Sequence, residues 1–206
     1  MSDQPSPDGV TDDELVARIA ERDGPALSAL FRRRQAVVYR VAMLMTGSPA
    51  AAEDVTQDVF LTVIHDALRF EPGRASVTAW LCGIARNHAR RRLERDRRML
   101  PLPEQPESLI PESVVHSDPL HEMSNAEQIE TLRRAILTLP VRYREVVVLC
   151  DLQDLSYADA AIALACSIGT VRSRLHRGRA LLSAKMQARA SAPARAAAKK
   201  ISRCLA

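Results

Sequence analysis

The sequence predicts an all-α protein made of two small helical domains that are joined by a flexible linker. Alanine, leucine, valine and arginine are abundant, and this mixture favours helices over strands. Aromatic residues make up only 3% of the 206 residues, and no strand-like alternation of apolar and polar residues runs along the chain. An acidic, proline-rich stretch separates the two helical halves.

That stretch predicts the domain boundary. Residues 99–130 contain seven acids, no Lys or Arg, and five of the twelve prolines. Proline at this density opposes helices and favours extended backbone, and loops beyond about 15 residues are uncommon inside compact domains. We therefore expect domains at 1–98 and 127–187, a linker at 99–126 that reaches up to about 90 Å, and a basic tail at 188–206.

The N-terminal domain shows helix start signals in the expected order. Thr11 can cap the first helix. Ser48 followed by Pro49 gives an N-cap and a proline at the first helical position, which predicts the third helix. A break at Gly24-Pro25 separates the first two helices. We expect helices over 11–22, 26–46 and 49–68, and a last one from about Val77 into the arginines that follow.

The C-terminal domain predicts a helix-turn-helix. We expect helices over 129–139 and 140–150, then from Ser156 to 165, and a last one from Thr170. Ser156 and Asp159 resemble a capping box with Asp in place of Glu. A four-residue turn, 166–169, precedes an arginine-rich helix, which is the arrangement of a DNA-binding helix-turn-helix.

The distribution of charge indicates a polyanionic partner. The net charge is +4, yet residues 160–206 carry ten Lys or Arg and no acid, which leaves the preceding residues at −6. A second basic cluster, 86–98, holds seven arginines against two acids. Basic patches of this kind are typical of proteins that bind nucleic acid.

The helix from Thr170 divides into two faces. Val171, Leu175 and Leu182 recur at spacings of four and seven and predict a buried stripe. Arginine can bind guanine bidentately in the major groove, and a short serine allows close approach to the DNA. A solvated basic helix is the alternative, but the turn, the cap and the charge agree on recognition. The residues predicted to read DNA are Arg172, Ser173, His176 and Arg177.

The basic cluster 86–98 offers a second nucleic-acid face. An asparagine beside arginines can read a base edge while the arginines hold phosphates. Trp80 precedes this cluster at helical spacing with Leu81 and is expected in the core rather than as a stacking platform. The residues of the predicted face are Arg86, Asn87, Arg90 and Arg91.

The helix at 49–68 has an unusual outer face. Val55, Val59 and Val63 form its predicted inner stripe. The outward residues fit either a solvated acidic surface or a protein-docking surface, and the pattern alone does not decide between them. These outward residues are Asp54, Gln57, Asp58 and Leu61.

Several classes of protein are excluded. No apolar run is long enough to cross a membrane, and the acidic N-terminus is unlike a signal peptide. The four cysteines lie far apart and lack CxxC spacing, which argues against a disulfide scaffold or a zinc module and fits a protein of the reducing cytoplasm. Cys150 and Cys166 are expected to act as small buried apolar side chains rather than as redox sensors. The chain has no glycine-rich phosphate loop and no HExxH. We therefore expect no enzymatic activity, no metal and no cofactor.

Specific motifs resemble a known family. The segment 52–60 reads AEDVTQDVF and resembles region 2.2 of bacterial RNA polymerase sigma factors. Residues 69–87 resemble regions 2.3 and 2.4, and three short segments resemble region 4: 139–140, 155–157 and 169–175. With two motif-rich modules and nothing between them but the linker, the chain resembles the extracytoplasmic-function, or group 4, sigma factors.

The resemblance implies a role for each predicted face. Asp54, Gln57 and Asp58 would dock on the β′ subunit of RNA polymerase core, which also comprises the β subunit. Asn87 with its neighbouring arginines would engage opened promoter DNA at the −10 element, beside the 70–77 loop. The face that includes Arg172 would read the −35 element as duplex. An anti-sigma factor is a further expected partner.

Two other functions remain to be distinguished. An ordinary helix-turn-helix regulator would bind its operator without polymerase and would not need the outer face of the 49–68 helix. A sigma-like decoy that sequesters an anti-sigma factor would be expected to lack the basic readout residues that this chain keeps.

Overall fold

The computed structural model describes residues 9–99 and 125–204, and all regular structure in these two ranges is helical. The first range forms α1 (Asp12–Ala20), α2 (Gly24–Thr46), α3 (Pro49–Asp66), a 3-10 turn η1 (Ala67–Arg69) and α4 (Val77–Met99). The second forms α5 (Asn125–Leu137), α6 (Val141–Val147), a π-helical turn η2 (Val148–Leu152), α7 (Tyr157–Ala163) and α8 (Ile168–Cys204). The predicted all-α fold is confirmed.

Local start signals position the N-terminal helices as the sequence predicts. The Thr11 hydroxyl accepts from the Glu14 N–H while the Glu14 carboxylate accepts from the Thr11 N–H, which completes a capping box. Ser48 caps α3 through the Ala51 N–H. The predicted break between the first two helices is present but lies at 21–23 rather than at Gly24-Pro25: Asp23 caps α2, and Pro25 lies in its first turn, where a missing N–H costs nothing.

Gly47 ends α2 in a conformation that favours glycine. Its φ is +76°, in the left-handed region, and its N–H donates to the Met43 carbonyl at 2.8 Å. A Cβ at this position would also lie 3.1 Å from a methyl of Leu137 on α5. The turn between α2 and α3 is therefore closed locally and lies against the second helical range.

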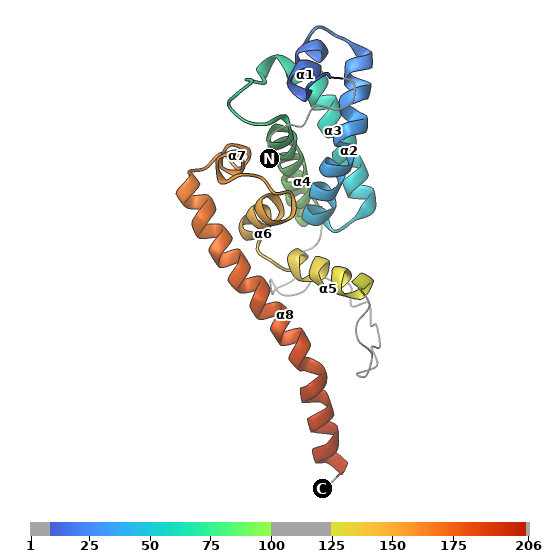
Figure 1. The fold of residues 1–206 in the computed structure, drawn as a ribbon. Coiled ribbons are helices and arrows are strands. Elements are labelled where there is room, and N and C mark those ends of the chain that lie inside the picture. The colour runs from blue at the N-terminus through green and yellow to red at the C-terminus, as the bar shows by residue number, and fades with distance from the viewer. Residues whose placement is uncertain (1–8, 100–124, 205–206) are drawn as a thin grey trace.

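The core combines the two ranges. Val55, Val59 and Val63 on α3 are buried, as predicted, and so are Val171 and Leu175 on α8. These side chains belong to one continuous cluster of buried apolar residues that includes all four N-terminal helices and α5 to α8. The α4 helix packs against α7, and α2 packs against α5 and α6 (Figure 1).

The last helix differs from the prediction at both ends. It begins at Ile168 rather than Thr170, because the Ser167 hydroxyl accepts from the Thr170 N–H and caps it. It also continues past the expected domain end at 187 to Cys204, away from the rest of the molecule (Figure 1). The alanine-rich composition of the tail favours this extension. The proposed linker falls largely outside the described residues.

Candidate nucleic-acid interface

The outer face of α3 presents the four predicted residues to solvent. Asp54, Gln57 and Asp58 are exposed, and Leu61 is 55% exposed. The buried valines on the opposite side hold the helix in this orientation, so truncation of the outer side chains leaves the core untouched. The arrangement provides an apolar side chain within an acidic and amide surface, which suits a protein partner.

Two of these acids also contact α4. The Asp54 carboxylate lies 2.5 Å from a guanidinium nitrogen of Arg92, and the Asp58 carboxylate lies 3.7 Å from His88 Nδ1. His88 Nε2 is 2.9 Å from the Thr62 hydroxyl. The acidic face of α3 and the basic cluster of α4 are therefore adjacent surfaces rather than separate ones.

An apolar groove adjoins this face between α2 and α3. The Phe31 and Phe60 rings meet edge to face with centroids 4.8 Å apart, and Leu27 lies beside them around a space of about 360 Å³. Phe31 is 36% exposed. This groove was not predicted from the sequence, although Leu27 and Phe31 stand four residues apart on one helix and could have indicated it.

The four predicted residues on α4 are not equivalent. Asn87, Arg90 and Arg91 are exposed, whereas the Arg86 side chain is only 12% exposed. Arg86 Nε donates to Glu145 Oε1 at 2.8 Å, and its Nη1 donates to the Asn87 side-chain oxygen at 2.9 Å. Three of the residues are therefore exposed at the surface, and the fourth is held by a carboxylate from α6.

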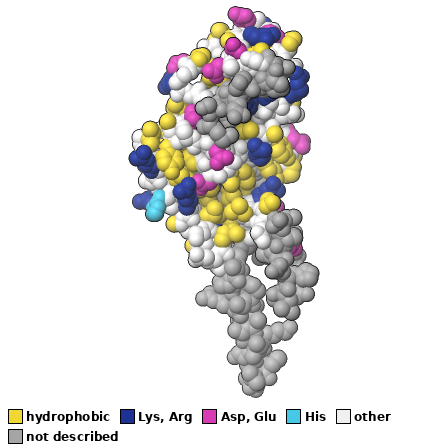
Figure 2. Space-filling model, viewed as in Figure 1, with side chains coloured by type: hydrophobic (Ala, Val, Ile, Leu, Met, Phe, Trp, Pro, Cys, Tyr) yellow, Lys and Arg dark blue, Asp and Glu magenta, His cyan; other side chains and the backbone are white. Residues whose placement is uncertain are grey.

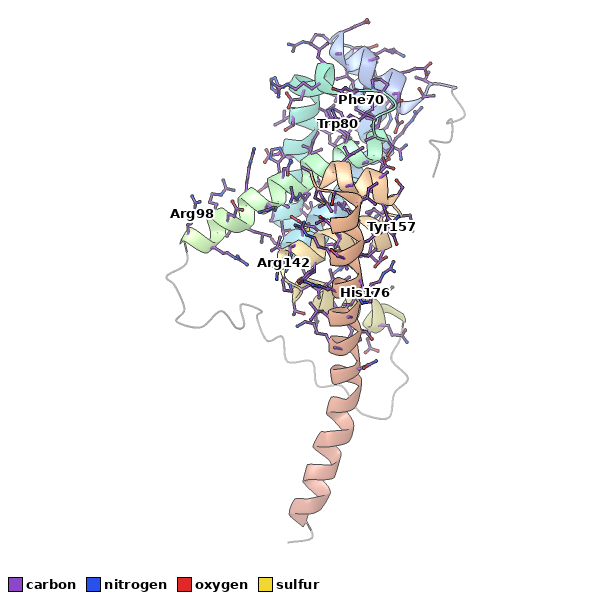
Figure 3. The ribbon with its side chains drawn as sticks, turned by 90° about the vertical axis from the view of Figure 1, so that its left-hand side faces the viewer. Phe70, Trp80, Arg98, Arg142, Tyr157 and His176 are labelled. Atoms are coloured by element: carbon purple, nitrogen blue, oxygen red, sulfur yellow. The ribbon has the colours of Figure 1, made fainter. Side chains whose placement is uncertain are left out.

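Phe70 and Trp80 flank the loop that precedes α4 (Figure 3). Their ring centroids lie 5.1 Å apart, and Trp80 is half-buried and packs against the core, as expected. The Ser76 hydroxyl caps α4 by accepting from the Ala79 N–H, and the Ser76 N–H donates to Asp159 on α7. The loop is therefore tied to both helical ranges.

The helix-turn-helix forms as predicted. Ser156 caps α7 through the Asp159 N–H, and Ser167 caps α8. The four predicted DNA-reading residues on α8 are all exposed: Arg172, Ser173, His176 and Arg177. A stripe of buried apolar residues on the opposite side holds them outward.

A close helix crossing positions α8. Gly178 is buried, and a Cβ there would lie 2.8 Å from a methyl of Val147 and 3.3 Å from the Tyr143 carbonyl. Only glycine lets α8 approach α6 this closely. This role was not predicted from the sequence, because Gly178 lies inside a helix that already has an apolar stripe.

Arg142 adds a basic side chain on α6, the helix that packs against α8 (Figure 3). A hydrogen bond with Arg177 lowers the pKa of the Tyr143 hydroxyl, despite an opposing contribution from burial. The Arg142 guanidinium lies 4.8 Å from the centre of the Tyr143 ring, and that of Arg172 lies 5.9 Å from the centre of the Tyr157 ring. Arg142 therefore extends the cationic surface, and Figure 2 shows basic side chains around an apolar area on one face.

No group of three or more His, Cys, Asp or Glu side chains capable of holding a metal ion occurs among the described residues. Within the same ranges, no helix is long and apolar enough to cross a membrane. Burial raises the pKa of the Cys82 thiol to about 12 and, with help from Asp151, that of Cys150 to about 11. Neither thiol is in its reactive ionised form near neutral pH.

Two family models match the chain. The model described as Sigma-70 region 2 matches residues 30–99, and the model described as Sigma-70, region 4 matches residues 129–182. The first therefore contains the predicted faces of α3 and α4, and the second contains the helix-turn-helix.

Curated relatives agree with these models. The chain is 35% identical over 162 residues to the ECF RNA polymerase sigma factor SigE of Mycolicibacterium smegmatis, over 75% of this chain but only 59% of that protein. It is 32% identical to the ECF RNA polymerase sigma factor SigC of Mycobacterium tuberculosis, over 82% of this chain and 90% of that protein. It is also 32% identical to the ECF RNA polymerase sigma-E factor of Escherichia coli K12, over 86% and 95% respectively.

Solved structures show the same fold. CnrH in complex with the cytosolic domain of CnrY matches with a TM-score of 0.63 and 26% identity, over 86% of this chain and 97% of that chain. The sigma factor RpoE in complex with the anti-sigma factor NepR, from Bartonella quintana, matches with a TM-score of 0.60 and 23% identity, over 78% and 96%.

Proposed function

Because the chain belongs to the ECF sigma factors of the sigma-70 family, which direct transcription initiation, we propose that its three exposed faces bind polymerase core, the −10 element and the −35 element. The observation that carries this proposal is the presence in one chain of an acidic and amide face on α3 and two arginine faces on α4 and α8. An ordinary helix-turn-helix regulator has no use for the first of these.

Polymerase core binds the outer face of α3 in this proposal. Asp54, Gln57 and Asp58 supply polar contacts to the β′ subunit, and Leu61 supplies an apolar anchor at 55% exposure. The apolar groove beside Phe31 and Phe60 extends the same surface and suits a helix of the partner. Core polymerase, including its β subunit, is the principal protein partner.

Opened promoter DNA binds α4. Asn87 is exposed and carries an amide that can pair with a base edge, while Arg90 and Arg91 beside it attract phosphates. Arg86 joins them once it leaves Glu145. Base edges of this kind are accessible only after the strands separate, so this face contributes to opening rather than to the first encounter.

Duplex DNA at the −35 element binds α8. Arg172 and Ser173 lie near its N-terminus, the end that a recognition helix places against base edges. His176 and Arg177 follow one turn later, and Arg142 on α6 adds a phosphate contact nearby. The chain acts through binding energy and carries out no chemistry of its own, so it needs neither metal nor cofactor.

We propose the remaining assignments with the bounds predicted from the sequence. Residues 1–98 form region 2, 99–126 the linker, 127–187 region 4 and 188–206 a basic tail. CnrH and the Bartonella RpoE were solved with CnrY and the anti-sigma factor NepR, and an anti-sigma factor is the corresponding partner proposed here. The site of action is the cytoplasm, where promoter DNA and polymerase are found.

Run-off transcription tests the proposal. Purified core polymerase is combined with the full chain on a pool of promoter fragments from the source genome. The expected result is specific transcripts that depend on this chain and are lost with Asp58→Arg. DNA binding without any core-dependent transcript would favour a helix-turn-helix regulator, and core or anti-sigma binding without DNA binding would favour a decoy.

A further inference from the structure

Tyr143 lies where α6 crosses α8, beside the part of α8 that carries Arg177. A Cβ on Gly178, the residue that follows Arg177, would lie 3.6 Å from the Cβ of Tyr143 and 3.3 Å from its carbonyl. The tyrosine is only 9% exposed. It is therefore held in place by the crossing of the two helices.

Two guanidinium groups contact this tyrosine. The Arg142 guanidinium lies 4.8 Å from the centre of the Tyr143 ring. The Tyr143 side chain also forms hydrogen bonds with Arg177 and Arg142. Because a guanidinium offers only donors, the phenol oxygen is the acceptor in these hydrogen bonds. Two cations, one from α6 and one from α8, therefore converge on one neutral oxygen.

This convergence lacks the anion that usually accompanies it. Two guanidinium groups brought together repel each other unless a negative charge lies between them. Arg179, two residues further along α8, has such a partner, because the Asp151 carboxylate lies 2.5 Å from its guanidinium. In the parts of the chain that the structure describes, neither Arg142 nor Arg177 forms an ion pair with a carboxylate. An anionic ligand would complete the arrangement.

The position of Arg177 on α8 favours a backbone phosphate as that ligand. Arg172 and Arg177 are five residues apart, which is about 140° around a helix and about 7.5 Å along it. Arg172 lies nearer the N-terminus, the end that a recognition helix places against base edges, and its guanidinium lies 5.9 Å from the centre of the Tyr157 ring on α7. Arg177 instead contacts α6. Phosphates border the major groove on both sides, so a flank of the helix meets phosphate before base.

We propose that Arg142, Tyr143 and Arg177 form a clamp for one backbone phosphate of the −35 duplex. The two guanidinium groups bind the phosphate, whose oxygens match their paired N–H donors. Tyr143 is a positioning residue, because its hydroxyl keeps Arg177 turned toward the phosphate and away from the bases. The inference rests on the proposed function, which gives α8 a DNA ligand, and it leaves base reading to the residues nearer the N-terminus of α8.

Tyr143→Phe separates positioning from packing. It keeps the ring that contacts Arg142 and fills the crossing, and it removes only the hydroxyl. Arg177→Ala removes a cation at an exposed position, so the core is retained. Tyr39→Phe, which removes a hydroxyl from α2, is the matched control. Circular dichroism confirms equal helix content for the full-length variants.

Binding to duplexes of random sequence measures the phosphate contact, because such a contact carries no sequence information. The probe is a pool of fluorescein-labelled duplexes of about 30 base pairs, enough for several registers at about 3.4 Å per base pair. We expect Arg177→Ala to bind about tenfold more weakly and Tyr143→Phe about threefold, while Tyr39→Phe matches the unmodified chain.

Combining the two substitutions tests whether the hydroxyl acts through the arginine. Tyr143→Phe with Arg177→Ala should bind only about tenfold more weakly, because the hydroxyl has nothing to position once Arg177 is gone. A loss of about thirtyfold would mean that the two side chains contribute independently. That result, or unchanged binding by Tyr143→Phe alone, would overturn the positioning role.

Salt dependence gives a readout that a purely structural tyrosine would not change. Each phosphate contact contributes about 0.9 to the slope of log affinity against log salt concentration. Arg177→Ala should reduce the slope by about that amount. Tyr143→Phe should reduce it in the same direction, although the substitution removes no charge. An unchanged slope for Tyr143→Phe would overturn the clamp.

Sequencing of the bound duplexes distinguishes phosphate binding from base reading. Arg177→Ala should enrich the same sequences as the unmodified chain, whereas Arg172→Ala should lose preference at one position. A changed preference in Arg177→Ala would make Arg177 a base reader and overturn the clamp. Failure of the unmodified chain to bind any duplex at low salt would count against the proposed −35 function instead.

Discussion

Helices α4 and α8 are built alike but expose their arginines differently. Each begins at a serine cap, buries an apolar stripe and contains a buried glycine at a close helix crossing. Gly178 brings α8 against α6 of its own module, on the side away from Arg172. Gly83 brings α4 against α7 of the other module, and Arg86 is covered as a result.

This difference in exposure determines when each helix is available to bind DNA in the proposed function. The proposed reading face of α8 is exposed, so in the proposed role it can meet duplex DNA without any rearrangement of the helices. The face of α4 is partly engaged by Glu145, and in the proposed role it binds only after the DNA strands separate. The position of the glycine, more than the number of arginines, decides which face is available.

The largest expected effect contrasts the two glycines in stability. Gly178→Leu should lower the free energy of unfolding by about 1–3 kcal/mol, because even its Cβ overlaps Val147 and overpacking cannot be relieved. Gly83→Leu should lose far less, since its module can simply detach. Urea unfolding followed by circular dichroism checks this. Equal losses for both variants would show that the crossings are equivalent.

The next effect concerns the outer face of α3, which lies beside α4. Asp58→Arg should weaken binding to polymerase core by about tenfold, and Gln57→Ala by less, because each removes a contact proposed for the polymerase. The fold should be retained, since both side chains are exposed and neither belongs to the buried apolar cluster of the chain. Glu21→Arg, a charge reversal at the exposed C-cap of α1, is the control. Titration of labelled core gives the affinities. Core affinity that is unchanged in Asp58→Arg would remove α3 from the interface.

The effect expected on α8 separates base reading from general attraction. Arg172→Ala should cost about 1–3 kcal/mol and relax preference at one position of the −35 element. Arg179, which is held by Asp151 at 2.5 Å, serves as the control, and its loss should weaken all DNA slightly and uniformly. Binding of the full chain to a panel of −35 duplexes at fixed salt distinguishes them. The same flat loss for both would make α8 a plain basic surface.

The last effect lies on the buried side of α4 and is seen only at high pH. Burial raises the pKa of Cys82 from 9.0 to about 12, so the unfolded chain loses this proton first as pH rises. The stability that depends on the neutral thiol is therefore complete below pH 9 and declines between pH 9 and about 12. Comparison with Cys82→Ala isolates this slope. A difference between the two proteins that stays constant over that range would place the thiol in water.

Much of this architecture could be predicted from local sequence. Thr11, Ser48 and Ser156 act on backbone N–H groups within three residues, so their caps are readable without tertiary information. The valine stripe of α3 and the outward position of Asp58 follow from helical periodicity in the same way. The end of α6 was less readable, because a π-helical turn at 148–152 replaces the expected continuous helix.

The contact between the modules could not be predicted. Glu145 directly precedes an apolar run, 146–149, which could have indicated a buried carboxylate with a partner, but Arg86 lies 59 residues away and nothing local points to it. Gly83 likewise resembles any helical glycine until Ala163 is placed against it. A contact between segments far apart in the sequence produces no periodic pattern along the chain. The roles of Asn87 and Arg172 could therefore be proposed from the sequence, whereas the contact that covers Arg86 could not.

The most direct test of this account is to follow promoter occupancy and strand opening separately in one experiment. Polymerase carrying Arg172→Ala or Asn87→Ala is compared on the same promoter, with duplex binding read by gel shift and opening by permanganate. The account predicts that Arg172→Ala lowers occupancy while bound complexes still open, and that Asn87→Ala lowers opening at unchanged occupancy. Equal effects of both substitutions on both steps would contradict the division of labour between α8 and α4.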